Sequence, residues 1–231
     1  FMKRGIIMAK DYSVFDVVGP NMIGPSSSHT AGAARLGKMG LKIAGKAVKS
    51  VKFYLHGSFA ETYKGHGTDK ALVGGILGFQ PDDARIRDSF QIAEEQGVNF
   101  EFIKCDLGEA EHPNTVKMEM VLEDGTTSIV KGASIGGGNV KLTEIDGLAL
   151  DFNGARPAVI LEIKDIPGAV SFVTGLLAHN NKNIAMMSTN KPAGSKYTFV
   201  TIETDEELDS HILDQIKKFE VVAKAVVLDR F

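Results

Sequence analysis

The sequence predicts an α+β protein of two domains, and three observations lead to that prediction. The chain of 231 residues is long enough for two modest hydrophobic cores. Residues 11–150 alternate glycine-rich polar loops with helix and strand patterns, whereas residues 157–231 follow the order strand, helix, strand, strand, helix, strand. The segment between them, residues 151–157 (DFNGARP), has the composition of a turn-rich linker.

The first domain is predicted to begin with a helix over residues 27–44. Its N-cap is Ser26 or Ser27, because serine is a favoured cap and Pro25 disfavours helix before it. Apolar residues recur at helical spacing, at Ala33, Leu36, Met39 and Ile43. Several glycines lower the intrinsic propensity of this helix, so we expect close packing against another element to compensate. These are Gly32, Gly37, Gly40 and Gly45.

The remainder of the first domain is predicted to alternate strands and helices. Residues 51–59 and 99–105 read as strands, and residues 69–77 and 82–96 read as helices. Asp82 or Asp83 can cap the second of these helices, and Gly97 can close it. A hairpin over residues 116–122 and 126–131 follows, and a last strand covers about 140–148.

The second domain has the βαββαβ order of a ferredoxin-like split motif. Predicted strands cover residues 158–163, 183–189, 197–203 and 221–228, and predicted helices cover 169–178 and 205–217. This motif packs its helices on one face of an antiparallel sheet. Because the other face would remain open, the sequence predicts pairing with a second copy.

Composition excludes several classes of function. A net charge of −3 gives no basic surface for nucleic acid. No apolar run approaches the roughly 20 residues that cross a bilayer, and no secretory pattern is apparent, so we expect a cytoplasmic protein that binds no membrane. The single cysteine, Cys105, falls in a predicted strand and is expected to be a buried structural residue. One cysteine cannot form an internal disulfide or ligate an iron–sulfur cluster, so any cysteine-held cofactor must come from another chain.

A cluster of hydroxyls and one imidazole opens the long predicted helix, at residues 24–30 (GPSSSHT). The unpaired amides of a first helical turn and the helix dipole favour an anion. His29 would lie on that turn, and a carboxylate beside a histidine is the arrangement needed for proton transfer on an amino or hydroxy acid. The alternative is a polar helix cap with a histidine that takes no part in chemistry.

Two further polar clusters lie in the first domain. His66 stands between two glycines, before a helix that Thr68 or Asp69 can cap, and an accessible imidazole there can act as acid or base. Residues 134–139 (SIGGGN) present a row of backbone amides that can wrap an anion, with no dinucleotide-type spacing. His56 suits a hydrogen-bonded core position as well as a catalytic one. Each cluster alone could be a solvated loop, but together they predict a site for a small anionic molecule.

These motifs resemble those of the beta chain of bacterial iron–sulfur L-serine dehydratases. The matching segments are residues 13–16 (SVFD), 24–32 (GPSSSHTAG), 56–58 (HGS), 64–69 (KGHGTD) and 134–138 (SIGGG). The resemblance covers nearly the whole chain from about residue 13. The C-terminal domain resembles an ACT domain, whose hallmark is an Asp-x-Pro-Gly turn after the first strand, here residues 165–168. The first domain resembles the allosteric substrate-binding domain.

The resemblance implies deamination of L-serine to pyruvate and ammonia without pyridoxal phosphate. It implies a 4Fe-4S cluster that cysteines of a partner alpha chain ligate and that acts as a Lewis acid, with no metal ligand in this chain. His29 and His66 are then the expected groups for proton transfer. The residues expected to bind the substrate or shape its pocket are Ser26, Ser27, Ser28, Thr30, Ser134, Gly136 and Gly137.

The same resemblance supports a second interpretation. Some phosphoglycerate dehydrogenases carry the allosteric substrate-binding domain, which regulates them and does not catalyse. This chain would then be a non-catalytic regulatory subunit that binds serine or another small carboxylate, and a purely structural role is a third alternative. In ACT domains the effector often lies at a pairing interface, near the turn glycine and the start of the second strand, here Gly168 and Asn183. Self-association through either domain is expected.

Overall fold

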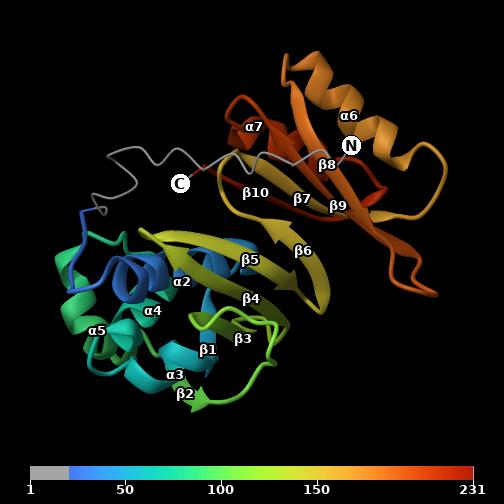
Figure 1. Ribbon diagram of the computed structural model, residues 1–231. Helices are drawn as coiled ribbons and strands as arrows, with labels where there is room; N and C mark the ends of the chain where they lie inside the picture. Colours follow the sequence, from blue (N-terminus) through green and yellow to red (C-terminus); the bar gives the residue numbers. More distant parts are fainter. Residues whose placement is uncertain (1–20, 231) are drawn as a thin grey trace, which may run out of the picture.

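Two β-sheets, each with helices packed on it, form the part of the chain that the computed structural model describes, residues 21–230. Figure 1 shows the N-terminal sheet and its helices below the C-terminal domain. Residues 13–16, which contribute to the family resemblance, lie outside the described range. Between residues 21 and 230, no helix combines the length and the apolarity of a membrane-spanning segment.

The first sheet has six strands in the order β2-β1-β3-β4-β5-β6. Its strands are β1 (Val48–Leu55), β2 (Asn99–Lys104), β3 (Thr115–Leu122), β4 (Thr127–Gly136), β5 (Asn139–Ile145) and β6 (Leu148–Phe152). Only the β1–β2 pair of these neighbours is parallel. The strand predicted near 140–148 is two strands, because Asp146 and Gly147 adopt positive φ and turn the chain back. The predicted strand 51–59 ends at Leu55, and His56 begins a helix there.

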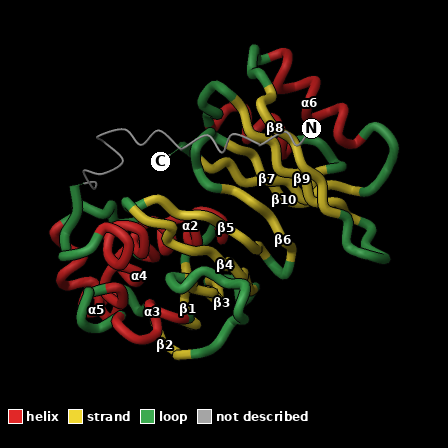
Figure 2. The backbone as a smooth tube through the Cα atoms, viewed as in Figure 1, coloured by secondary structure: helices red, strands yellow, loops and turns green. Residues whose placement is uncertain are grey.

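The helices of the first domain gather on one side of this sheet (Figure 2). They are η1 (Ser27–Ala31), α2 (Gly32–Ala44), α3 (Gly57–Thr62), α4 (Thr68–Ile76), η2 (Ala84–Asp88) and α5 (Ser89–Glu95). The long helix predicted over residues 27–44 is present, but its first turn is π-helical, and Ser26 caps it. The helix predicted over 82–96 begins as a 3₁₀ turn, with Asp83 accepting from the Arg85 amide.

The glycines of α2 do allow the close packing that the sequence predicts. A Cβ at Gly37 would overlap the carbonyl oxygen of Leu72 and lie 3.0 Å from the Cα of Gly75 in α4. A Cβ at Gly75 would in turn overlap the carbonyl oxygen of Ala34. The backbones of α2 and α4 therefore touch, and this contact fixes the relative position of the segments that precede each helix.

The second domain has the predicted βαββαβ order, with a sheet of order β10-β7-β9-β8. Its elements are β7 (Ala158–Lys164), α6 (Ala169–His179), β8 (Ile184–Asn190), β9 (Tyr197–Thr204), α7 (Ser210–Lys217) and β10 (Val222–Leu228). Helix α7 starts later than predicted, because Asp209 caps it by accepting from the Ile212 amide at 2.9 Å. Val159, Leu161 and Ile163 of β7 pack in the core of this domain.

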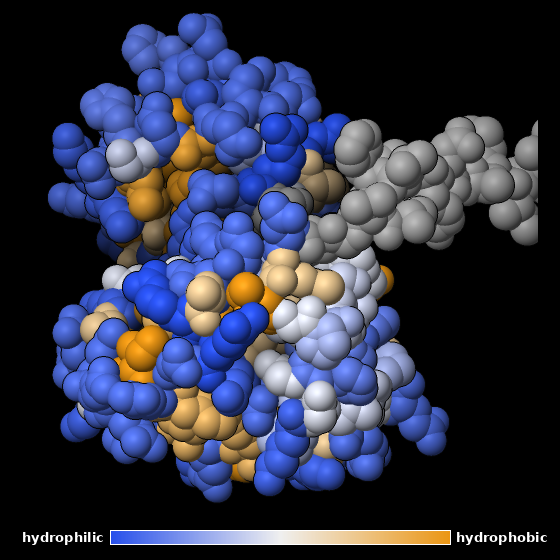
Figure 3. All heavy atoms as spheres, turned by 90° about the vertical axis from the view of Figure 1, so that its left-hand side faces the viewer, coloured by the Kyte–Doolittle hydropathy of each residue, from blue (hydrophilic) through white to orange (hydrophobic). Residues whose placement is uncertain are grey.

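The other face of the second sheet is only partly open. Ala158 and Ile160, which alternate with the core residues of β7, pack with Leu228 into the core of the first domain. Lys224 Nζ also lies 3.0 Å from Asp146 Oδ2 across the junction. Strand β8 is the edge of this sheet; Asn190 of β8 donates to the Ala149 carbonyl of β6 at 3.1 Å, and the side chains of Met186 and Met187 are about half exposed. In Figure 3 the surface is mostly hydrophilic, with apolar atoms showing in the C-terminal domain and beside the junction.

Candidate functional site

His29 lies on the π-helical turn η1, which hydroxyl groups hold from two sides. The Ser26 side chain accepts a hydrogen bond from the His29 amide at 3.2 Å and lies 3.4 Å from Nδ1 of its ring. Nε2 of His29 lies 3.0 Å from the hydroxyl of Ser58 at the start of α3. The edge-on packing of the ring against Phe59, with centroids 5.4 Å apart, further fixes its orientation. A hydroxyl can donate or accept, so these contacts suit either tautomer of the imidazole.

His66 lies in the loop between α3 and α4, directly beside His29. The two ring centroids are 4.9 Å apart. The hydroxyl of Thr30 donates to the carbonyl oxygen of His66 at 3.2 Å, which ties this loop to η1. The predicted cap by Thr68 or Asp69 is wrong. Gly67 occupies the N-cap position of α4 with a left-handed backbone (φ 69°), and no side chain caps the helix there. Two histidines that are distant in the sequence therefore lie side by side.

Burial shifts the pKa values of His29 and Asp69 toward the uncharged form of each side chain. The pKa of His29 is lowered, first because burial removes solvent from the ring and second because His66 lies beside it. His29 is therefore neutral near pH 7, which is the form that accepts a proton. The pKa of the Asp69 carboxyl is raised, chiefly by burial at the start of α4.

Ser134 is the member of the glycine-loop cluster that reaches this region. Its buried hydroxyl faces the start of α2, where a Cβ on Gly32 would overlap it. Gly136 and Gly137 form the turn beyond it, because β4 extends to Gly136 and the expected loop is a tight hairpin into β5. Nη1 of Arg35 in α2 donates to the carbonyl oxygen of Gly138 at 2.6 Å.

Five buried side-chain polar atoms make no hydrogen bond to any described group: His66 Nδ1, Thr68 Oγ1, Asn114 Oδ1, Thr115 Oγ1 and Ser134 Oγ. Buried polar atoms normally have partners, so a cluster of unpaired ones favours a polar ligand. His66 and Thr68 lie in and after the His66 loop, and Ser134 faces the start of α2. Asn114 and Thr115 adjoin them, because the Ser134 amide donates to the Asn114 carbonyl at 3.0 Å.

The sequence-based reasoning missed three residues of this region. Ser58 belongs to the motif at residues 56–58 (HGS), but the sequence predicted no role for it at the site. Asn114 and Thr115 belong to no motif, and the one available signal was a polar pair directly before an alternating strand.

His56 has the structural role, because its Nδ1 accepts a hydrogen bond from the Leu107 amide at 3.1 Å, just before α3 begins. Ser27 and Ser28 lie half-buried on η1 with His29.

Cys105 follows β2 and is only half-buried, with its amide donating to the carbonyl oxygen of Leu55. Burial, and then the neighbouring Asp106, raise the pKa of its thiol.

Gly168 and Asn183 in the second domain lie at opposite ends of α6. A helix of that length is about 16 Å long, so the two residues do not meet within one chain. The side-chain amide of Asn183 instead donates to Asp205 at 2.6 Å.

Comparison with known proteins identifies both halves of the chain. A family model described as "Serine dehydratase beta chain" matches residues 13–144, and one described as "ACT domain" matches residues 158–221. The L-serine dehydratase beta chain of Peptoniphilus asaccharolyticus is 44% identical over 206 residues, which is 89% of this chain and 93% of that protein. A probable L-serine dehydratase beta chain of Bacillus subtilis is 42% identical with the same coverage.

Two weaker similarities concern proteins of other names. D-3-phosphoglycerate dehydrogenase of Bacillus subtilis is 22% identical over 198 residues, which is 85% of this chain and 37% of that protein. The solution NMR structure of the ACT domain from GTP pyrophosphokinase of Chlorobium tepidum covers 32% of this chain and 86% of its own, at 17% identity and a TM-score of 0.27.

Proposed function

Since this chain belongs to the serine dehydratase beta chain family and carries an ACT domain, we propose that it is the beta subunit of an enzyme that converts L-serine to pyruvate and ammonia. Loss of the α-proton and of the hydroxyl gives water and aminoacrylate, whose hydrolysis gives pyruvate and ammonia. The observation that carries the proposal is the His29–His66 pair, with ring centroids 4.9 Å apart. Such a reaction needs a group that accepts one proton and a group that supplies another.

We assign the acceptance of the α-proton to His29. Its lowered pKa supports this role, because an imidazole that is neutral near pH 7 can take up a proton. Its contacts with Ser26 and Ser58 hold the ring in place while the proton moves. His66 would then supply the proton that leaves with the hydroxyl.

The substrate carboxylate is proposed to bind at the start of η1. Helix N-termini present unpaired amides and a positive dipole end to an anion. The hydroxyls of Ser26, Ser27, Ser28 and Thr30 surround that terminus, and Ser134 faces it from β4. Gly136 and Gly137 would shape the side of the pocket that the β4–β5 turn forms.

This chain does not itself offer the ligands of a 4Fe-4S cluster. Cys105 is its only cysteine. Within residues 21–230, no group of three or more histidine, cysteine, aspartate or glutamate side chains converges as metal ligands do. We therefore propose that cysteines of a partner alpha chain ligate the cluster, which would supply Lewis-acid chemistry when the two chains assemble. The proposed reaction needs no pyridoxal phosphate.

Anaerobic reconstitution tests this function. The chain would be mixed with its cysteine-bearing partner, supplied with iron and sulfide, and assayed for pyruvate with L-serine as substrate. We expect pyruvate only when both chains are present. A mixture that shows full cluster absorbance yet forms no pyruvate would contradict the proposal, and so would equal turnover by the partner alone.

The similarity to D-3-phosphoglycerate dehydrogenase over 85% of this chain favours a second candidate, a regulatory subunit that binds serine or another small carboxylate. Under that alternative, the partner would keep its basal activity when His29 and His66 are both replaced. Because Gly168 and Asn183 lie at opposite ends of α6, one effector could touch both only if a second copy contributed one of them. The edge strand β8 is the place where we propose that such copies pair.

A further inference from the structure

We propose that the junction of the two domains contains a binding site for a small organic dianion, separate from the histidine pair. A cavity of about 240 Å³ lies between α2, the Gln80-Pro81 segment and residues Leu228, Asp229 and Arg230 at the end of β10. This volume is below the roughly 300–1,000 Å³ of pockets for drug-sized ligands, so the ligand must be small.

The charge of the lining gives the chemical class of the ligand. Arg35, Lys38, Lys42 and Arg230 line the cavity, and Asp229 is the one carboxylate among the lining residues. Asp229 pairs with Lys42 at 2.5 Å and also acts on Lys38, so one carboxylate faces four cations in the cavity. The whole chain has a net charge of −3, so this concentration of positive charge is a local feature. A ligand with two negative charges would compensate it.

The three remaining cations are available to a ligand. Arg35 uses one N–H on the Gly138 carbonyl, but a guanidinium has five. Arg230 lies 3.9 Å from Glu207, an exposed and weak contact. Lys38 is half-buried, and its pKa is lowered by burial first and by Lys42 second, which together outweigh the opposite effect of Asp229. An ammonium in that position is stabilised by an anion that replaces its lost solvation.

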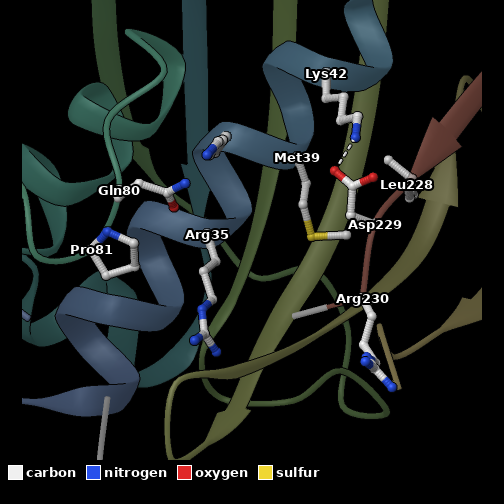
Figure 4. Close-up of a pocket in the computed structure, with 9 residues that line it drawn as sticks. Arg35, Met39, Lys42, Gln80, Pro81, Leu228, Asp229 and Arg230 are labelled. Atoms are coloured by element: carbon white, nitrogen blue, oxygen red, sulfur yellow. Dashed lines mark hydrogen bonds and ion pairs between the residues drawn. The ribbon is translucent and has the colours of Figure 1, made fainter. Parts of the chain in front are cut away.

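The arrangement of the side chains fits an organic molecule with oxyanion groups at both ends (Figure 4). Arg35 comes from α2 and Arg230 from the segment after β10, and both line the cavity. Met39, Pro81 and Leu228 supply apolar surface for a short carbon chain. Guanidinium groups bind carboxylate and phosphate alike through paired N–H donors, so dicarboxylates and phosphate monoesters share the required chemistry.

Such a ligand would bridge the two domains. Arg35, Lys38 and Lys42 belong to the first domain and Arg230 to the second, and the Lys42–Asp229 pair already joins the two segments in the cavity. Binding would therefore stabilise the folded chain by mass action, which makes the melting temperature a direct measure of occupancy.

Isothermal titration and thermal melting of the full chain test the proposal. Succinate and glycerol 2-phosphate serve as probes at constant ionic strength, with sodium chloride as the compensating salt. We expect saturable binding of at least one probe and a higher melting temperature. The Lys38→Gln/Arg230→Gln variant should lose about 10-fold or more in affinity, whereas Lys196→Gln, an exposed lysine in the β8–β9 loop, should bind as the unmodified chain does.

The outcomes separate the two sources of the anion. Binding of only succinate, or only the phosphate ester, supports the proposal and selects the ligand class. Lys38→Arg keeps the charge and should keep the binding, which guards against a variant that simply misfolds. Absence of saturable binding of both probes at millimolar concentration would overturn the site, as would equal affinity in the double variant.

Discussion

The two domains of this chain use their glycines and buried polar groups differently. In the first domain, Gly37 and Gly75 lie where two helix backbones touch, whereas a Cβ on Gly175 in helix α6 of the second domain would meet nothing within 4 Å. The five unpartnered buried polar atoms found in residues 21–230 also all lie in the first domain. Tight backbone packing therefore accompanies the site, because it fixes the turns that carry His29 and His66.

The largest expected difference between the domains appears when one histidine in each domain is replaced. His66→Ala should lower pyruvate formation by the assembled enzyme by about 10²–10⁴-fold, which is the usual contribution of a general acid or base. His179→Ala, at the exposed end of α6, should leave turnover within twofold. Pyruvate formation at saturating L-serine measures both.

The His66 prediction also requires that the assembly stay intact. The absorbance of the iron–sulfur cluster and the far-ultraviolet circular dichroism should match those of the unmodified enzyme. Turnover of His66→Ala above a tenth of normal would show that the two domains do not differ in catalytic contribution, and would favour the regulatory alternative.

Glycine-to-alanine substitutions compare the packing of the domains. Gly37→Ala places a methyl group against the Leu72 carbonyl and should destabilise the chain by about 1–3 kcal/mol. Gly175→Ala, in an open helix interior, should stabilise it by about 0.5–1 kcal/mol, because alanine has the higher helix propensity. Urea unfolding measures both free energies. Equal effects of the two substitutions would contradict the distinction between tight and open helix packing.

Local patterns predicted most of the elements, and the exceptions have local causes. The βαββαβ order and the close packing of α2 were predictable, since periodicity and glycine content report on them directly. The division of the strand near 140–148 was missed although the Asp146-Gly147 dipeptide, with positive φ at both residues, is a recognised hairpin-turn signal. The predicted cap of α4 was wrong for another reason: Gly67, with a positive φ that glycine readily adopts, precedes the helix and takes the cap position.

The site was predictable only as separate motifs. The segments around His29, His66 and Ser134 each stood out, but the distance between them depends on the α2–α4 contact and on β4. Asn114 and Thr115 approach Ser134 through the pairing of β3 with β4, which no local pattern encodes. The packing of Ala158 and Ile160 of β7 into the core of the first domain was also missed, because it depends on how one domain packs on the other.

The pH dependence of stability should depend on His29, which is half-buried on η1. The folded chain lowers the pKa of His29 below its ordinary 6.5, by burial first and by His66 second. Between the two pKa values the unfolded chain binds more protons, so the free energy of unfolding falls as the pH falls below 6.5. It stops falling from this cause below the folded pKa. His29→Gln should reduce that decline, measured by urea unfolding from pH 7.5 to 5, and an unchanged decline would contradict this cause.

The smallest effect concerns self-association, where the comparison is between an edge strand and an interior one. Met187 lies on β8, at the edge of the second sheet, and its side chain is 46% exposed; Val121 lies on β3, between β1 and β4, and is 37% exposed. A lysine on an edge strand disfavours pairing with another chain. Met187→Lys should therefore weaken self-association several-fold in sedimentation measurements, and Val121→Lys should not. An equal shift for both would mean that copies do not pair through β8.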